Sequence, residues 1–104
     1  MAYCLLADVK LILQIPLSDT QFDSELEGSM ASADALIDGL LKRDGLTVPT
    51  PAPQLIKDAS AHYAAWLFRK RRDPTGAEAF WAEAEKFLVA HVQAEGEASK
   101  VTFA

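Results

Sequence analysis

A stripe of apolar residues between Thr20 and Gly45 constrains the fold of this chain more than any other feature of its sequence. The stripe consists of Phe22, Leu26, Met30, Ala33, Ile37, Leu40 and Leu41. Gaps of three and four residues place these side chains on one side of a helix, because each helical residue advances by about 100°. Acidic residues at the start and basic residues at the end match the helix dipole, and Gly45 can supply the left-handed residue that ends the helix. We therefore expect a rod over ~30 Å long, against which the rest of the chain packs.

Three further helices are predicted around this rod. They cover about residues 5–14, 53–72 and 76–94. Pro16 ends the first, because the residue before a proline avoids the helical region, and Gly96 is expected to close the last. Four alanines in the third helix leave thin places where another helix can approach closely. No run of alternating apolar residues is long enough for a sheet, so the predicted fold class is all-α, with one four-helix domain over residues 1–96 and a flexible C-terminal tail over residues 97–104.

The segment between the second and third helices, Asp44 to Pro53, reads DGLTVPTPAP. Its three prolines remove backbone donors and fix φ, so we expect an extended connector. About ten residues is longer than the usual link between helices of a small bundle, which favours a role in partner contact. Val48 is the candidate interaction residue of this connector, and together with Leu46 it is also expected to pin the connector to the core.

Composition bounds the class of protein. The 104 residues suffice for one domain, and no apolar run approaches the ~18 residues that cross a bilayer. The start of the sequence lacks a basic leader, and Cys4 is the single cysteine, so a reducing cytoplasmic compartment is expected, with no membrane. A net charge of −5 argues against a surface built as a whole for nucleic acid.

No catalytic, cofactor-binding or metal-binding motif is present, so we expect no enzyme and no cofactor. His62 and His91 fall on separate helices and are interpreted as packing residues. Asp34 and Asp38 have the i, i+4 spacing of a carboxylate pair, but an acidic solvated face is the favoured interpretation. Trp66 and Trp81 lie on apolar stripes and are expected to be buried on facing helices.

Four consecutive cations, Arg69, Lys70, Arg71 and Arg72, interrupt an otherwise acidic sequence. One interpretation is structural, because cations in the last turn of a helix complement its dipole. The other is a local patch that faces phosphates, as in a DNA channel, or an acidic partner. Four neighbouring residues spread around the helix circumference, so they cannot all serve one purpose, and both interpretations stay open.

The C-terminal tail carries large apolar residues after a polar segment that contains Gly96. Val101 and Phe103, with Lys100 beside them, are candidates for protein interaction. They either fold back on the domain or bind a neighbour as an added strand.

Several stretches together resemble the small helical head–tail connector proteins, also called adaptor or head-completion proteins, of tailed bacteriophages and their prophages. The similar residues are Tyr3, Asp8 and Val9 near the start, Ala33, Ile37 and Asp38 in the long helix, and Pro53, Leu55, Ile56, Ala59 and Tyr63 in the third helix. The resemblance covers roughly residues 3–92. It implies a structural protein of the virion neck, assembled in the bacterial host cytoplasm. Such a protein forms a homo-oligomeric ring, expected to be dodecameric on the portal protein. The ring continues the DNA channel with at most non-specific contact to passing DNA, and offers a surface to a tail or stopper protein.

The alternative hypothesis is a small helical DNA-binding regulator that uses the basic turn at Arg69–Arg72. Against it, no pair of predicted helices is joined by the three- or four-residue turn of a helix-turn-helix. The closest junction, Asp73 to Thr75, would also place acids on the helix that reads the DNA.

Overall fold

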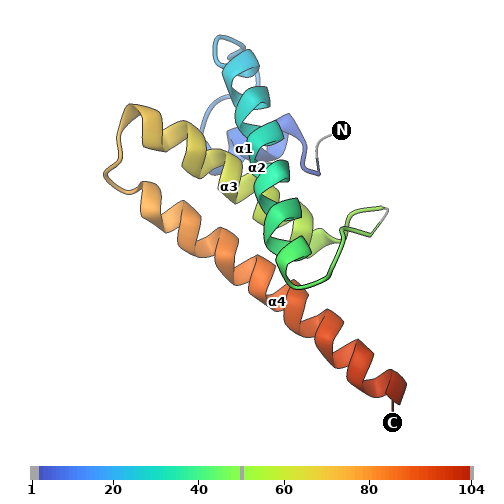
Figure 1. Ribbon diagram of the computed structural model, residues 1–104. Helices are drawn as coiled ribbons and strands as arrows, with labels where there is room; N and C mark the ends of the chain where they lie inside the picture. Colours follow the sequence, from blue (N-terminus) through green and yellow to red (C-terminus); the bar gives the residue numbers. More distant parts are fainter. Residues whose placement is uncertain (1–2, 50, 104) are drawn as a thin grey trace.

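The chain folds into four α-helices, which a computed structural model describes over residues 3–49 and 51–103, with side chains through residue 94 (Figure 1). The helices are α1 (Leu6–Leu13), α2 (Asp23–Arg43), α3 (Gln54–Arg72) and α4 (Ala77–Phe103). No strand occurs within the described ranges. The prediction of an all-α fold with four helices is therefore confirmed.

The centre of the fold is α3, which packs against each of the other three helices. The expectation that α2 is the rod against which everything packs was wrong, because α4 packs along α3, and α2 is shorter than α4. Small side chains explain the central place of α3. All four of its alanines are buried, namely Ala59, Ala61, Ala64 and Ala65. An alanine adds little bulk, so neighbouring helices come close to the α3 backbone.

The hydrophobic core takes its largest fully buried side chains from three helices. They are Val9 of α1, Leu26, Ile37 and Leu41 of α2, and Ile56 and Tyr63 of α3. The predicted stripe of α2 supplies its buried face, as its spacing indicated. α4 contributes Ala84 and Leu88. The core therefore forms on both sides of α3.

α2 ends in a Schellman motif, in which two backbone hydrogen bonds satisfy the last carbonyls of the helix. The N–H of Gly45 donates to the carbonyl of Lys42 at 3.0 Å, and the N–H of Leu46 donates to the carbonyl of Leu41 at 2.9 Å. Gly45 has φ 75°, so its predicted left-handed conformation is confirmed. Leu46 then packs against the core. The connector between α2 and α3 thus leaves the helix end in a fixed direction.

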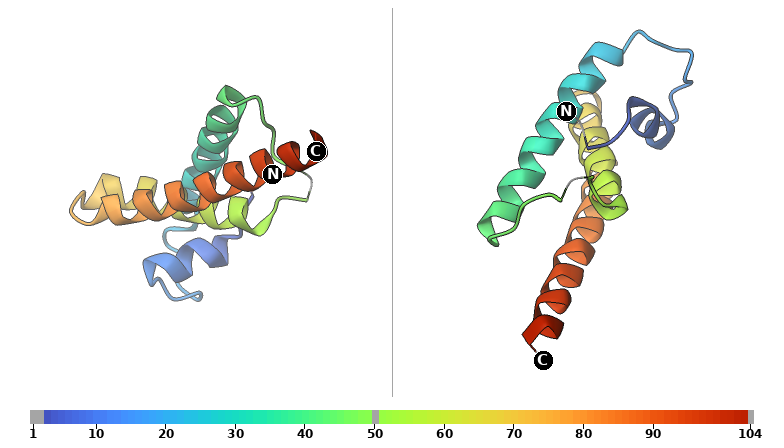
Figure 2. Two further views of the ribbon diagram at one scale, coloured as in Figure 1. Left: turned by 90° about the horizontal axis from the view of Figure 1, so that it is seen from below. Right: turned by 90° about the vertical axis from the view of Figure 1, so that its right-hand side faces the viewer.

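α4 continues through Gly96 to Phe103, so the predicted helix end at Gly96 was wrong, and the backbone of residues 97–103 is helical. A glycine inside a helix costs only about 1 kcal/mol relative to alanine. Good helix formers flank it, and no proline follows it to stop the helix. Figures 1 and 2 show this end of α4 running past the other three helices.

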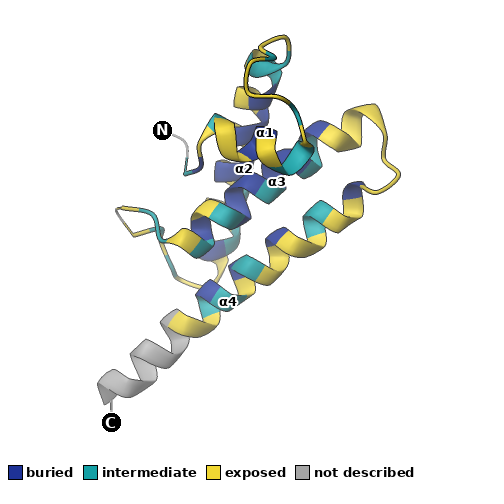
Figure 3. Cartoon of the chain, turned by 180° about the vertical axis from the view of Figure 1, so that it is seen from behind, coloured by how far each residue is buried: buried dark blue, intermediate teal, exposed yellow. Residues whose placement is uncertain are grey.

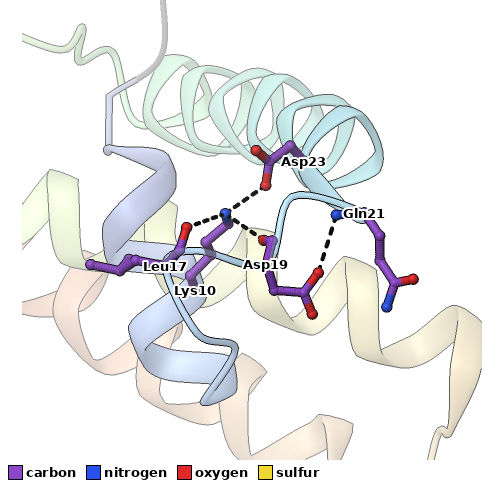
Figure 4. A network of polar contacts seen from close by, with 5 residues as sticks. All are labelled: Lys10, Leu17, Asp19, Gln21 and Asp23. Atoms are coloured by element: carbon purple, nitrogen blue, oxygen red, sulfur yellow. Dashed lines mark hydrogen bonds and ion pairs between the residues drawn. The ribbon is translucent and has the colours of Figure 1, made fainter.

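A buried lysine joins α1 to the start of α2 (Figure 4). Lys10 is 3 % exposed, and its Nζ forms an ion pair with Asp23 Oδ1 at 2.6 Å. The same nitrogen donates to the carbonyls of Asp19 at 2.8 Å and Leu17 at 3.3 Å. An ammonium has three donors, and all three find an acceptor here. Burial of this charge is tolerated because it is paired and fully hydrogen-bonded, and the contacts fix the loop between α1 and α2.

Two glycines at one end of α2 should respond in opposite ways to substitution by alanine. Gly39 lies inside the helix with nothing within 4 Å of an added Cβ, so Gly39→Ala should raise the free energy of unfolding by up to about 1 kcal/mol. Gly45→Ala should lower it by about 1–2 kcal/mol, because alanine is strained at positive φ. Urea denaturation of both variants measures the difference. Equal effects would contradict the assigned end of α2.

Candidate interaction surface

Two tryptophans meet where α4 packs along α3. The rings of Trp66 and Trp81 lie with centroids 4.5 Å apart at 57°, and Tyr63 meets Trp81 edge-on at 5.1 Å. The prediction that the indoles face each other from two helices is confirmed. The prediction of full burial was wrong, because each indole is half-buried. Neither α1 nor α2 covers this edge of the α3–α4 interface, and the Trp81 indole N–H donates to Glu85 in the same helix.

An apolar hollow of about 400 Å³ opens between the C-terminal end of α2 and the middle of α4. We call it the α2–α4 groove. Leu41, Tyr63 and Leu88 are buried residues at its base. Leu40 and Val89 line it as more accessible apolar residues. Burial, and to a lesser degree the charge of Glu85, raises the pKa of Tyr63 to about 12. The phenol is therefore neutral at ordinary pH, and the groove presents an apolar base to whatever enters it.

Charged residues stand around the α2–α4 groove. Arg43 and Asp44 come from the end of α2, and Glu85 comes from α4. On the α4 side, Val89 is 51 % exposed, and Figure 3 shows exposed residues following the outer side of α4. An uncovered apolar surface with a polar rim is typical of a protein interaction site.

The basic run at the end of α3 separates into residues with different surroundings. Arg72 pairs with Glu25 of α2, and its guanidinium lies 4.6 Å from the ring of Phe22 and 4.5 Å from that of Phe68. Lys70 Nζ lies 4.7 Å from the ring of Trp66. These two cations help to hold α3 against its surroundings, as the structural interpretation proposed.

Arg69 and Arg71 are exposed and form no ion pair with the described part of the chain. They are the members of the basic run that remain open to a partner. The expectation that one run of cations cannot serve a single purpose therefore agrees with the geometry. DNA-channel or acidic-partner contact stays a prediction for these two residues.

The interpretation of Asp34 as part of a solvated face was wrong. Asp34 is 8 % exposed. Its Oδ2 accepts the backbone N–H of Tyr3 at 3.0 Å, and its Oδ1 accepts the hydroxyl of Ser60 at 2.7 Å. The Tyr3 hydroxyl donates to Asp38, one turn further along α2. The carboxylate pair is therefore a clamp that holds the start of the chain against α2 and α3.

Burial shapes the titration of this clamp. Loss of solvent raises the pKa of Asp34, although hydrogen bonds from Ser60 and Tyr3 oppose the shift. Loss of solvent also raises the pKa of the Cys4 thiol, whose Sγ lies 3.3 Å from the hydroxyl oxygen of Ser60. A thiol with a raised pKa and 4 % exposure is a poor nucleophile. The cluster is consistent with a structural role.

Within the described residues, no group of three His, Cys, Asp or Glu side chains could hold a metal ion. His62 and His91 fall on α3 and α4. His62 Nδ1 lies 2.8 Å from the carbonyl of Asp58, and its ring contacts Phe87. His91 is buried. No helix in the same part of the chain is long and apolar enough to span a bilayer.

The other predicted interaction residues lie in two places. Val48 is half-buried and packs against the core, as expected for a residue that pins the connector. Lys100, Val101 and Phe103 fall in the last turns of α4, and their side chains lie outside the described residues. Sequence reasoning missed the α2–α4 groove. Its one local signal is Val89, an apolar residue outside the inward stripe of α4.

Comparisons of this chain with protein-family models, with curated proteins and with solved structures find no match. The function must therefore be argued from the surface itself and from the resemblance in residues 3–92.

Asp34→Asn should change how stability depends on pH. Because its pKa is raised in the folded state, the folded chain holds this proton to higher pH than the unfolded chain does. Wild-type stability from this group is therefore present below about pH 4, the ordinary carboxyl pKa, and is lost as pH rises through the raised pKa. Asp34→Asn should lack that loss.

Melting curves from pH 3 to 8 compare the two proteins, and parallel pH profiles would contradict the assignment. Asp34→Ala is the companion variant. It leaves the N–H of Tyr3 and the hydroxyl of Ser60 without their acceptor and should cost about 1–3 kcal/mol of stability.

Arg72→Ala and Arg71→Ala form a matched pair at the end of α3. Arg72→Ala should lower the free energy of unfolding by about 1 kcal/mol, because it removes the contact with two aromatic rings and the pair with Glu25. Arg71→Ala should change it by less than about 0.5 kcal/mol. Equal losses in urea denaturation would show that Arg72 has no special structural role.

Proposed function

We propose that this chain is a structural subunit of a head–tail connector of a tailed bacteriophage or prophage. It assembles with copies of itself into a ring between the portal protein and the tail or stopper, and the ring continues the DNA channel. The observation that carries the proposal is the α2–α4 groove, an apolar surface held open on a helical framework. A protein that acts alone has no use for such a surface. The resemblance in residues 3–92 adds the type of assembly.

The polar clusters favour an assembly protein over an enzyme. Asp34, Ser60 and Cys4 hydrogen-bond or contact one another in the interior, and Lys10 is saturated by three acceptors. Both clusters are used to join segments of the chain. We therefore assign the chain no catalytic role and no cofactor, and place it in the virion neck after assembly in the host cytoplasm.

The alternative of a DNA-binding regulator has less support. Arg72 and Lys70 are engaged with Glu25 and with aromatic rings, which leaves Arg69 and Arg71 of the basic run. Two cations on a chain of net charge −5 suit weak, salt-sensitive contact with passing DNA. They do not suit sequence-specific recognition, which needs a helix able to enter the major groove.

The end of α4 provides the test of this function. Its last residues, Lys100, Val101 and Phe103, are the proposed contact with the portal protein. Co-expression with the portal protein encoded beside this chain should give a ring attached to the portal, visible by negative-stain electron microscopy. Deletion of residues 97–104 should abolish the attachment and leave the helical circular dichroism of residues 3–94 nearly unchanged.

Two outcomes would count against the proposal. Failure of the full-length chain to bind its portal protein would contradict the connector function. Nanomolar binding to one DNA sequence at physiological salt would replace it with the regulator function. Arg71→Ala serves as a control, because it should bind the portal like the wild type.

A further inference from the structure

A second exposed apolar surface lies on and around α1. Leu5, Leu11 and Leu17 are 69 %, 77 % and 65 % exposed. Single exposed leucines are ordinary on protein surfaces. Three of them around one two-turn helix are a stronger sign of contact with another molecule.

The outward face of α1 is presented rigidly. Ala7 and Leu11 are exposed one turn apart, whereas Val9 and Lys10 on the inward side are buried. The contacts of Lys10 with the following loop and with α2 fix the helix in place. A side chain on a fixed helix loses little conformational freedom on binding. Leu11 is therefore suited to enter an apolar hollow.

The charges around the two surfaces are opposite. Asp8 and Asp19 accompany the leucines, and Lys10, the one cation in residues 3–21, is buried. The α2 end of the groove carries Lys42 and Arg43, both exposed. Contact between the two surfaces would bring opposite charges together, whereas contact of either surface with itself would bring like charges together.

The two surfaces lie on different sides of one molecule. Both views of Figure 2 show α1 and the C-terminal half of α2 on opposite sides of the α3–α4 pair. One chain therefore cannot fill its own groove with its own α1. Two different patches that complement each other give a head-to-tail contact, which closes into a ring when the rotation between copies allows it.

We propose that the α2–α4 groove of one copy binds the α1 surface of a second copy, with Leu11 inserted beside Val89 and Asp8 near Arg43. This inference rests on the proposed function and names the contact between neighbouring subunits. A short helix lying in a groove between two helices is a common mode of recognition. The same contact repeated around the ring would leave the end of α4 free for the portal.

Two variants that break opposite halves of the contact test the proposal. Leu11→Glu should spoil the α1 surface, and Val89→Glu should spoil the groove. In sedimentation velocity from about 10 μM to 1 mM, the wild type should associate with rising concentration. Each variant alone should associate at least tenfold more weakly. Ala31→Glu, which adds the same charge at another exposed helical position, should behave as the wild type does.

An equimolar mixture of the two variants is the decisive sample. The intact α1 surface of the Val89→Glu chain can bind the intact groove of the Leu11→Glu chain, so the mixture should form dimers and nothing larger. A wild type that stays monomeric would overturn the proposal. So would a variant that associates normally, or a mixture that stays monomeric. If circular dichroism shows that either glutamate variant is unfolded, Leu11→Ala and Val89→Ala provide the same comparison.

The results separate this proposal from the connector function. Rings on the portal that persist in the Leu11→Glu variant would reject the contact and keep the function. Head-to-tail association without any binding to the portal would keep the contact and reject the function.

Discussion

Close contact between α3 and its three neighbours is the constraint on which the rest of the structure depends. Ala59, Ala64 and Ala65 are fully buried, so the helices around α3 approach a surface with little side-chain bulk. Larger residues there would force the helices apart, since overpacking a filled core costs about 1–3 kcal/mol. Because each neighbour packs mainly on α3, the neighbours do not fully cover one another. The opening between α2 and α4 is a consequence of this arrangement.

The positions of the helices could be predicted from the sequence, but the central helix could not. A narrow apolar stripe such as that of α2 is typical of a helix that buries one face. The buried residues of α3 are less confined to one stripe, because Ser60 and Ala61 are buried together with Ile56 and Tyr63. Alanine contributes weakly to an apolar stripe, so the helix with the greatest burial was not the one with the clearest pattern. Gly96 misled for a simpler reason, since a lone glycine weakens a helix without ending it.

Features built from distant segments were beyond the reach of local patterns. Asp34 and Asp38 have a spacing that fits an exposed acidic face as well as a clamp. Burial of Asp34 depends on Ser60, 26 residues later, and on Tyr3, 31 residues earlier. The α2–α4 groove likewise combines the end of α2, Tyr63 of α3 and the middle of α4. Neither could be seen before the helices were placed in space.

The residues that carry the resemblance to connector proteins are mostly those that hold the helices together. Tyr3 binds Asp38, and Asp8 accepts the backbone N–H of Leu5 at the start of α1. The remaining members that are buried are Val9, Ala33, Ile37, Ile56, Ala59 and Tyr63. A shared pattern of this kind reports how the helices are arranged. It says little about which partner each face binds, because partner contact depends on exposed residues outside the pattern. Leu11 and Val89 belong to that second group, which is why the surface adds information that the resemblance does not contain.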